Sequence, residues 1–547
     1  MSVKIDAPPE TVGERFLFAL VLLWSFIGMC FPLFDTDFWW HLKTGQWILE
    51  GNGIPYIDLY TFTDSEKPWI DLHWGFQVLI AILYHLGGVP LVTLVKAGTI
   101  TAAIAVAWQA GGTNLPAWKK AALWLLPIIC VVGRGNERPE MLSQLFLAMW
   151  LWIARQTDWR PGLIWFLPLV QVIWVNCHAL FVLGLVVGFC YAVDAVVREM
   201  ANGRYGLEPR SAGPDLRIVG FVGVSVAIAC LINPYFEEGA LFPLTLYRKF
   251  SVEKDFYCQN IGEFRPPIEF VRRYGIQGLR NVYLLAEIGT WLLTFFSFAW
   301  LLITKQKWSL FRLLMFAGFS HLAWQASRNT NIFAIVSGFI ACENFADARR
   351  TLLPKGTSTR SMLSRVHCTT GMTVFIVALC LAVVTGWWNE IAEKNKPFGL
   401  GEAPNWFIHD AAKFASQPGF PHRAFVAHIG QAEVYVYHNG PQNRVFMDAR
   451  LEVCTQQTFE LFNRILTNMA HGDPVWQTHF HDGELPVVIL DSRISRPAIN
   501  GMLMTPGWRL VFADRSAAVF LTNERANRLG LPVADPSPLI DPDGKMR

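Results

Sequence analysis

Carboxylates and imidazoles gather in one polar stretch, residues 34–74, that directly follows an apolar run of spanning length. Asp35 and Asp37 stand one residue apart at its start. If Asp37 opens a short helix lying on the membrane, His41 lies one turn later on the same face. Tryptophans belong where a membrane meets water, whereas a group of acids does not, so this arrangement aims ionisable groups inward, at a site beside the bilayer. The same stretch also carries Asp58, Asp64, Asp71 and His73.

A simpler explanation covers part of this pattern. Asp35 or Asp37 can cap a helix N-terminus by accepting backbone N–H bonds, and the tryptophans can be interfacial anchors. Capping accounts for one aspartate, but not for two acids and two histidines in a long polar loop. We therefore predict a site at this loop. Because acids spaced by one residue can hold a hard cation, Asp35 and Asp37 are also candidates for binding Mg²⁺ or Mn²⁺.

The composition is that of a multi-span membrane protein. Of the 547 residues, 52% are hydrophobic and only 16% charged, with 23 Trp, 40 Phe and a mean hydropathy of +0.30. The net charge of +3 is small and scattered, with no basic block that interleaves aromatic residues. Nucleic acid is therefore excluded as a partner, and membrane lipids are expected to surround the chain.

Apolar segments of spanning or nearly spanning length recur along the first 390 residues and predict about eleven transmembrane helices. A further run, 74–87, is too short to span comfortably, and with 39–50 it suits a pair of interfacial helices in the first loop, 35–88. The predicted spans are 16–34, 89–111, 117–133, 141–155, 161–176, 179–197, 217–234, 282–303, 308–326, 329–345 and 371–388.

Basic residues orient these spans. If residues 1–14 are cytoplasmic, every loop that follows an even-numbered span is also cytoplasmic. Each of these loops is rich in Lys and Arg, as at Lys119 and Lys120 or Lys305 and Lys307. The positive-inside rule requires this arrangement, and an odd number of spans then places the C-terminus outside the cytoplasm. We expect a multi-pass protein of a bacterial cytoplasmic membrane.

The loops on the opposite side are tight, polar and exposed to the same water layer as the first loop. Charged groups at helix ends on one side of a chain otherwise poor in charge suggest convergence on one pocket. For any one arginine taken alone, snorkelling to lipid headgroups is an equally good explanation. The longest of these loops, 235–281, is predicted to be a lid or a binding loop. The candidate residues are Arg134, Arg138, Glu140, Asn176, His178 and Arg328.

The composition changes at about Lys396, where a soluble, extracytoplasmic α/β domain is predicted over 396–524, followed by a flexible tail, 525–547. The membrane domain is then 15–389. Strands are predicted at 424–429, 433–438, 444–447, 486–490, 509–513 and 517–521, and helices at about 404–415, 454–471 and 496–503.

Several motifs in order resemble the C-type (GT-C) superfamily of lipid-dependent membrane glycosyltransferases, and more closely a largely uncharacterised bacterial branch of it. The first loop carries the most specific motif, DTDFWWHLKTGQWI, GIPYIDLYTFT and PWIDLHWG in succession. The resemblance covers about residues 15–524 and implies a polytopic α-helical GT-C-like fold. Shorter matches follow at Arg138-Pro139-Glu140, Asn176-Cys177-His178, Asn233-Pro234, Arg328-Asn329, Met447-Asp448-Ala449-Arg450 and 506–511.

The resemblance implies a polyprenyl-phosphate-linked sugar donor and an acid of the first loop at the reaction centre. The expected activity is that of a hexosyl- or pentosyltransferase acting on an envelope glycan, lipid or protein. Glycosyl transfer needs a base for the acceptor hydroxyl, and positive charge for the departing phosphate. Asp37 is the expected base, with Asp35 as the alternative and His41 beside them. Arg134, Arg138 and Arg328 are expected to bind the donor phosphate, because a guanidinium fork suits its oxygens. The pocket or the acceptor is expected to contact Asp71, His73, Glu140, Asn176, His178, Asp448 and Arg450.

Two other classes of function remain open. A lipid or glycan transporter or flippase would also have many spans, but such proteins usually carry internal repeats and ionisable sites near the bilayer middle. Here the polar residues gather at one face, which favours chemistry at the membrane surface. A non-catalytic binding or scaffold protein with the same architecture is the other alternative.

Overall fold

The computed structural model describes residues 10–201, 205–207, 213–352, 359–394, 396–480 and 484–539. Residues 1–9 of the predicted cytoplasmic segment and 540–547 of the predicted tail lie outside this range. The chain forms two compact units. The helical unit comprises Met1–Pro32 and Val89–Gly401, and the α/β unit comprises Leu33–Gly88 and Glu402–Arg547. The first loop, which we predicted as part of the membrane domain, therefore groups with the C-terminal segment.

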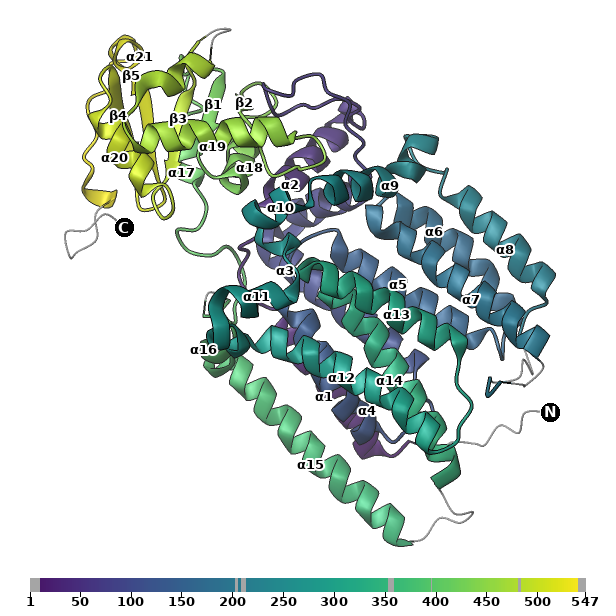
Figure 1. The fold of residues 1–547 in the computed structure, drawn as a ribbon. Coiled ribbons are helices and arrows are strands. Elements are labelled where there is room, and N and C mark those ends of the chain that lie inside the picture. The colour runs from purple at the N-terminus through teal and green to yellow at the C-terminus, as the bar shows by residue number, and fades with distance from the viewer. Residues whose placement is uncertain are drawn as a thin grey trace. The chain divides into compact units, whose positions relative to one another are not determined.

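Each of the predicted apolar segments contains a helix in the helical unit (Figure 1). Four helical segments in the described part of the chain are long and apolar enough to span a membrane: Trp74–Ala110, Ala179–Ala201, Val282–Ile303 and Leu363–Val384. The remaining spans stay predictions. The helices are α1 (Val12–Gly28), α3 (Trp74–Ala110), α4 (Ala117–Gly133), α5 (Glu140–Gln156), α6 (Leu167–Val175), α7 (Val182–Ala201), α8 (Leu216–Ala229), α9 (Phe236–Val252), α10 (Lys254–Asn260), α11 (Pro267–Tyr274), α12 (Val282–Ile303), α13 (Leu310–Gln325), α14 (Thr330–Leu352), α15 (Thr359–Val384) and α16 (Trp387–Ala392), with short 3-10 turns η2 (Pro161–Phe166), η3 (Ala179–Phe181), η4 (Gly262–Phe264), η5 (Gly275–Arg280) and η6 (Ser327–Asn329).

Buried polar pairs join the helices of this unit, in which α4, α12 and α14 pack against one another. Arg312 of α13 donates to Asn344 at 2.8 Å and to Asp347 at 2.7 Å, both on α14. Arg155 of α5 pairs with Glu343 of α14 at 2.8 Å. Because a buried charge is costly unless it is paired, these contacts fix which faces of α5, α13 and α14 meet.

Helix α3 is interrupted where a short interfacial helix, 74–87, was predicted to end. Gly87 has ψ 18° with an extended φ, and Gly88 has φ 60° and ψ −161°. Only glycine adopts the second of these backbone conformations without strain. The kink therefore separates residues 74–86 from the apolar helix that starts at Val89, the first residue of α3 in the helical unit.

The α/β unit is built on a five-stranded sheet of order β2-β1-β3-β5-β4. Strands β2, β1 and β3 run parallel, and β5 is antiparallel to both β3 and β4. Parallel strands buried on both faces read as continuous apolar runs, as in Val-Val-Ile-Leu of β3. The elements are α2 (Asp37–Trp47), a π-helical turn η1 (Ile48–Asn52), α17 (His409–Phe414), β1 (Arg423–Val426), α18 (Ile429–Asn439), β2 (Arg444–Val445), α19 (Gln456–Ala470), η7 (Pro474–His479), β3 (Val487–Asp491), α20 (Arg496–Met504), β4 (Trp508–Ala513), β5 (Ala517–Thr522), α21 (Asn523–Arg528) and η8 (Ser537–Leu539).

Two of the secondary-structure predictions made from the sequence differ from what this unit shows. The strand predicted at 433–438 is wrong, because these residues lie in α18. Their apolar alternation resembled a strand, but α18 is buried on several sides, against α2, α17, β1 and β2, so its apolar residues need not follow one helical face. The other prediction concerns the flexible tail, 525–547. Its first residues continue α21 to Arg528, and Ala534 N–H donates to Leu510 O at 2.9 Å, so the start of the predicted tail is part of the α/β unit.

Candidate functional site

The predicted catalytic acids lie at the start of α2. Asp37 is the first residue of this helix, and its backbone N–H donates to Asp35 Oδ1 at 3.1 Å. Asp35 is buried, whereas Asp37 is half-buried. Asp35 thus accepts the N–H of the first helical residue, although it is not the N-cap, which is Thr36, and Asp37 is the less buried of the two acids. This geometry suits Asp37 better than Asp35 for meeting a substrate hydroxyl.

A polar network joins α2 to the start of α3. Asp71 is fully buried and accepts from Gln77 Nε2 at 3.0 Å and from His73 N–H at 3.1 Å. His73 Nδ1 lies 3.3 Å from the same carboxylate oxygen, and Gln77 Nε2 lies 3.5 Å from His41 Nδ1. The two imidazole rings are 5.4 Å apart between centroids. The structure therefore brings three predicted residues, His41, Asp71 and His73, into one cluster around Gln77, which the sequence analysis had not singled out.

A metal site built by the protein does not fit this loop. Two carboxylates are available at Asp35 and Asp37, and Asp35 already accepts a backbone N–H bond. Among the described residues, no group of three or more His, Cys, Asp or Glu side chains is arranged to hold a metal ion. Since a divalent cation takes six or more oxygen ligands, these two acids would supply a minority of its shell.

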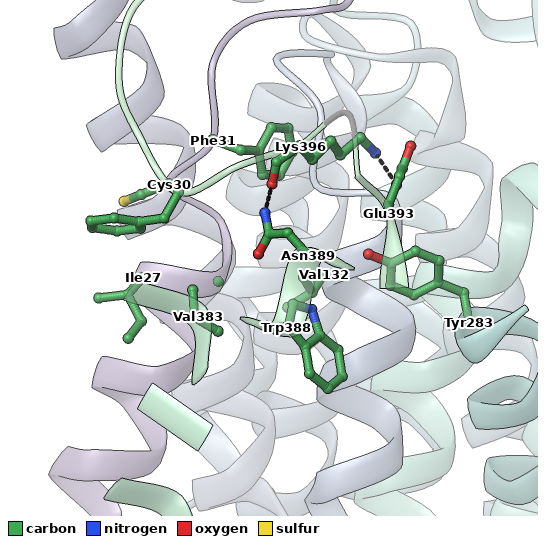
Figure 2. Close-up of a pocket in the computed structure, with 12 residues that line it drawn as sticks. Ile27, Cys30, Phe31, Val132, Tyr283, Val383, Trp388, Asn389, Glu393 and Lys396 are labelled. Carbon is green, nitrogen blue, oxygen red and sulfur yellow. Dashed lines mark hydrogen bonds and ion pairs between the residues drawn. The ribbon is translucent and has the colours of Figure 1, made fainter. Parts of the chain in front are cut away.

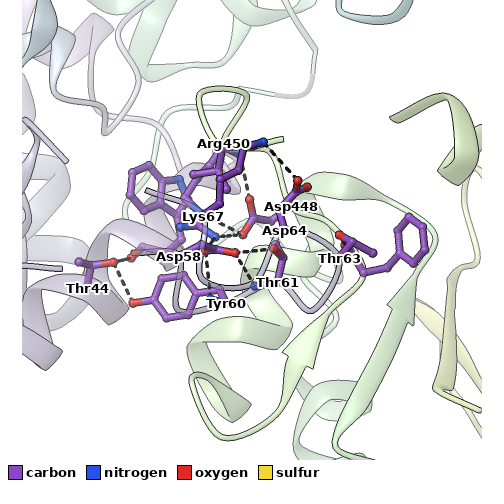
Figure 3. Close-up of polar contacts among 12 residues, drawn as sticks. Thr44, Asp58, Tyr60, Thr61, Thr63, Asp64, Lys67, Asp448 and Arg450 are labelled. Carbon is purple, nitrogen blue, oxygen red and sulfur yellow. Dashed lines mark hydrogen bonds and ion pairs between the residues drawn. The ribbon is translucent and has the colours of Figure 1, made fainter. Parts of the chain in front are cut away.

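Asp448 and Arg450 form a buried ionic cluster with Asp58 of the first loop (Figure 3). Arg450 Nη2 lies 2.5 Å from Asp58 Oδ1 and 2.7 Å from Asp448 Oδ2. Its guanidinium carbon lies 4.5 Å from the ring centroid of Trp69 and 4.8 Å from that of Tyr60. Burial lowers the pKa of Arg450, but the two carboxylates raise it well above its ordinary value. Asp448 and Arg450 are each 1% exposed, and because Arg450 pairs with Asp58 they hold the first loop in place. An acceptor contact at these residues stays a prediction.

The first loop also extends the edge of the sheet beside β2. Phe62 N–H donates to Val445 O at 3.0 Å, and Val445 N–H donates to Tyr60 O at 2.9 Å. Thr63 Oγ1 donates to Phe446 O, and Thr44 of α2 bonds the Tyr60 hydroxyl at 2.9 Å (Figure 3). Backbone pairing satisfies the exposed edge of a sheet. The loop that carries Asp37 is therefore built into the α/β unit and positioned by it.

In the helical unit, the three predicted phosphate-binding arginines surround one carboxylate that the sequence analysis missed, Glu263. Arg134 Nη2 lies 3.2 Å and Arg138 Nη1 3.3 Å from Glu263 Oε2. Arg328 faces the neighbouring Phe264 ring, 5.0 Å from its centroid. Burial raises the pKa of Glu263, but Arg138, Arg134 and Arg328 together lower it well below its ordinary value.

Glu140 lies in the same cluster. Its Oε1 is 3.6 Å from Arg134 Nη2, and its Oε2 accepts from Asn331 Nδ2 at 3.3 Å. The structure thus brings Arg134, Arg138, Arg328 and Glu140 together, while their roles stay predictions. These residues form the arginine cluster of the helical unit.

A buried ion pair positions the loop that carries two of these arginines. Lys96 of α3 and Glu137 are both buried, with Nζ 2.7 Å from Oε1. Lys96 also lies over the Phe31 ring at 3.8 Å, and Thr93 Oγ1 donates to Glu137 at 3.4 Å. The signal in the sequence was a lone lysine inside the apolar segment 89–111.

Asn176 and His178 each contact neighbouring helices of the helical unit. Asn176 Nδ2 donates to the carbonyls of Val172 and Ile232, both at 2.8 Å. His178 Nδ1 lies 2.8 Å from Ser143 Oγ, which accepts from Trp174 Nε1 at 2.8 Å. The role of these two residues in a pocket stays a prediction.

A small pocket lies at the ends of α1, α4 and α15 and the start of α12 (Figure 2). Lys396 Nζ lies 3.1 Å from Glu393 Oε2, and Asn389 Nδ2 donates to Lys396 O. The pocket offers about 20 Å³, which is the room that one water molecule needs. It is therefore too small for a sugar or a lipid headgroup, and none of the predicted site residues lines it.

Comparison with known proteins gives structural neighbours alone, since no protein-family model matches the chain and no curated protein does. The neighbours are oligosaccharyltransferase structures from the archaeon Archaeoglobus fulgidus. The first, oligosaccharyltransferase AglB with an inhibitory peptide and a dolichol-phosphate, has a TM-score of 0.52 and 11% identity over 88% of this chain and 69% of its own. A second, tethered to an acceptor peptide with an NVT sequon, has a TM-score of 0.51 and 10% identity over 95% and 74%. The apo form has a TM-score of 0.51 and 11% identity over 88% and 70%.

This likeness confirms, at the level of the fold, the resemblance to the GT-C superfamily that the sequence motifs suggested. At 10–11% identity it concerns the fold alone. The aligned region takes in most of the chain, so the fold resembles that of these oligosaccharyltransferases over most of its length.

Proposed function

We propose that this protein is a membrane glycosyltransferase that transfers a sugar from a polyprenyl-phosphate-linked donor to an acceptor of the cell envelope. The observation that carries the proposal is the GT-C-like fold over 88% of the chain or more. The proposed location is the extracytoplasmic face of a bacterial cytoplasmic membrane. A neighbour that binds dolichol-phosphate, itself a polyprenyl-type phosphate, supports the class of donor.

In the proposed reaction, Asp37 is the general base. Its carboxylate takes the proton of an acceptor hydroxyl as that oxygen attacks the anomeric carbon of the donor sugar. The bond between this carbon and the phosphate oxygen breaks, and the electron pair leaves with the phosphate. Asp37 suits this role because it is half-buried at the first turn of α2, while Asp35 fixes the turn by accepting its N–H.

The arginine cluster is proposed to meet the donor phosphate. Guanidinium groups bind phosphate oxygens with two parallel N–H bonds and stay charged at every physiological pH. Arg134 and Arg138 keep 19% and 20% of their side chains exposed, so a ligand can reach them. Charge developing on the leaving phosphate would be stabilised there.

The test uses purified protein in lipid with a mixed pool of polyprenyl-phosphate sugars, and mass spectrometry detects freed polyprenyl phosphate. We expect release by the wild type and its loss in Asp37→Asn. Glu50→Gln is the matched control, because Glu50 is an exposed acid just after α2 on the same loop. Release that persists in Asp37→Asn would remove Asp37 from the reaction. An absence of release from the wild type, despite bound lipid, would favour a transport or scaffold function.

A further inference from the structure

Glu263 occupies the place in the arginine cluster where an anion would bind. Its carboxylate accepts from Arg134 Nη2 at 3.2 Å and from Arg138 Nη1 at 3.4 and 3.3 Å. A carboxylate and a phosphate present similar oxygen acceptors to a guanidinium group. The three arginines carry three positive charges, whereas Glu263 and Glu140 carry two negative charges, so the cluster keeps a net charge of about +1 when all five are ionised.

The cluster also retains an unused donor. Arg134 Nε is buried, and no acceptor among the described residues bonds it. A buried N–H without an acceptor is costly, which makes it a point where a ligand oxygen would gain a bond. The Glu263 carboxylate therefore satisfies the cluster only in part.

The backbone around Glu263 is fixed, so its side chain can be exchanged without unfolding the loop. Ser327 N–H donates to Arg265 O at 3.0 Å, and Ser327 Oγ donates to Glu263 O at 3.3 Å. The adjacent Phe264 ring packs 4.8 Å from Phe250 and 5.6 Å from Tyr257. The Glu263 side chain keeps 23% of its surface exposed, which leaves it room to rotate towards water.

We propose that Glu263 is a resident substitute for the phosphate: it holds Arg134 and Arg138 in place when no donor is bound, and a polyprenyl phosphate displaces it. This inference rests on the proposed function for the identity of the ligand. It predicts that the cluster is preorganised at all times, and that every binding event must first break the contacts of Glu263. The Glu263 carboxylate thus competes with any phosphate for the two arginines and weakens phosphate binding. Free phosphate has no lipid tail to add affinity, so it does not displace Glu263.

The test measures binding directly, with farnesyl phosphate as the probe and full-length protein in detergent. We expect Glu263→Gln to tighten farnesyl phosphate binding by about tenfold, because one charge-assisted competitor is removed. Arg138→Gln is expected to weaken it by about tenfold. Glu269→Gln is the matched control: Glu269 lies half-buried on α11 of the same loop and pairs, at 3.9 Å, with the exposed Arg272. Farnesol, which has no phosphate, is expected not to bind any variant at the same site.

Each outcome has a distinct meaning. If Glu263→Gln binds farnesyl phosphate as weakly as the wild type, or more weakly, Glu263 is a structural brace and the inference is overturned. If Glu263→Gln destabilises the fold, Glu263→Asp keeps the charge with a shorter reach and is expected to tighten binding by a smaller factor; no tightening would overturn the inference. If Glu263→Gln tightens binding but the donor pool yields no released lipid phosphate, the inference stands and the proposed transfer fails.

Discussion

Arg450 Nη2 and Asp58 Oδ1 lie 2.5 Å apart although the two residues are separated by 392 positions in the chain. Neither side chain is exposed to solvent. Arg450 is also enclosed by Trp40, Tyr60 and Trp69, with ring centroids 4.5–5.9 Å from its guanidinium carbon. One buried ion pair therefore joins the loop of the proposed catalytic acid to the C-terminal segment of the same unit.

Replacing Arg450 by alanine is expected to destabilise the α/β unit strongly. The change leaves Asp58 and Asp448 buried without their cation, and breaking a buried pair in this way costs about 3–5 kcal/mol. Thermal unfolding of the full chain measures the loss, and hydrogen exchange over residues 58–69 locates it. Arg528→Ala is the control: its pair with Glu524, at 2.8 Å, is exposed, so we expect a change below about 1 kcal/mol. Equal losses in the two variants would contradict a special role for Arg450.

Much of the helical unit could be predicted from the sequence, because its signal is local. Long apolar runs predict helices by length and composition, and a helix is present at each predicted segment. Residues 433–438 show where a local signal fails: the alternation in this segment is common to a strand and to a helix buried on several sides, and contacts with α2 and α17 decide between them.

The site was predicted in part. Arg134, Arg138 and Arg328 stood out because they lie at helix ends on one side of a chain otherwise poor in charge, and all three act on Glu263. Glu263 did not stand out, since it lies in a loop of mixed charge, 129 positions from Arg134. The partners of Glu263 are set by the packing of segments that are distant in the chain. Residue spacing in the sequence carries no information about such packing.

Gly430 is expected to be required for the position of the Asp37 turn. A Cβ added at Gly430 would lie 2.3 Å from Thr36 Oγ1, the residue between Asp35 and Asp37. Gly430→Ala must therefore displace this turn, with a loss of about 1–3 kcal/mol in stability and faster hydrogen exchange at residues 35–39. The double variant with Thr36→Gly removes the clashing atoms and is expected to recover most of the loss. A double variant no better than Gly430→Ala alone would contradict the proposed contact.

His438 is expected to make the α/β unit less stable in mild acid. Burial, with His409, Lys413 and Lys43 nearby, lowers the pKa of His438 to about 4 from an ordinary 6.5. Between these values the unfolded chain binds the proton and the folded chain does not, so stability falls as pH falls from 6.5 towards 4. His438→Gln is expected to flatten the change in melting temperature between pH 6.5 and 5. His422→Gln, at an exposed histidine, is the control and is expected to keep the wild-type slope.

The pair of Lys96 and Glu137 should behave as a unit in the helical part of the chain. With Nζ and Oε1 2.7 Å apart and both side chains buried, either single change leaves one charge without compensation. We expect Lys96→Met and Glu137→Leu each to cost about 3–5 kcal/mol, whereas the double variant should cost far less, because apolar side chains of similar size avoid the desolvation of both ions. Thermal unfolding in detergent measures all three variants against the wild type. Losses that simply add in the double variant would show that the two charges do not compensate each other, and that another group holds the loop of Arg134 and Arg138.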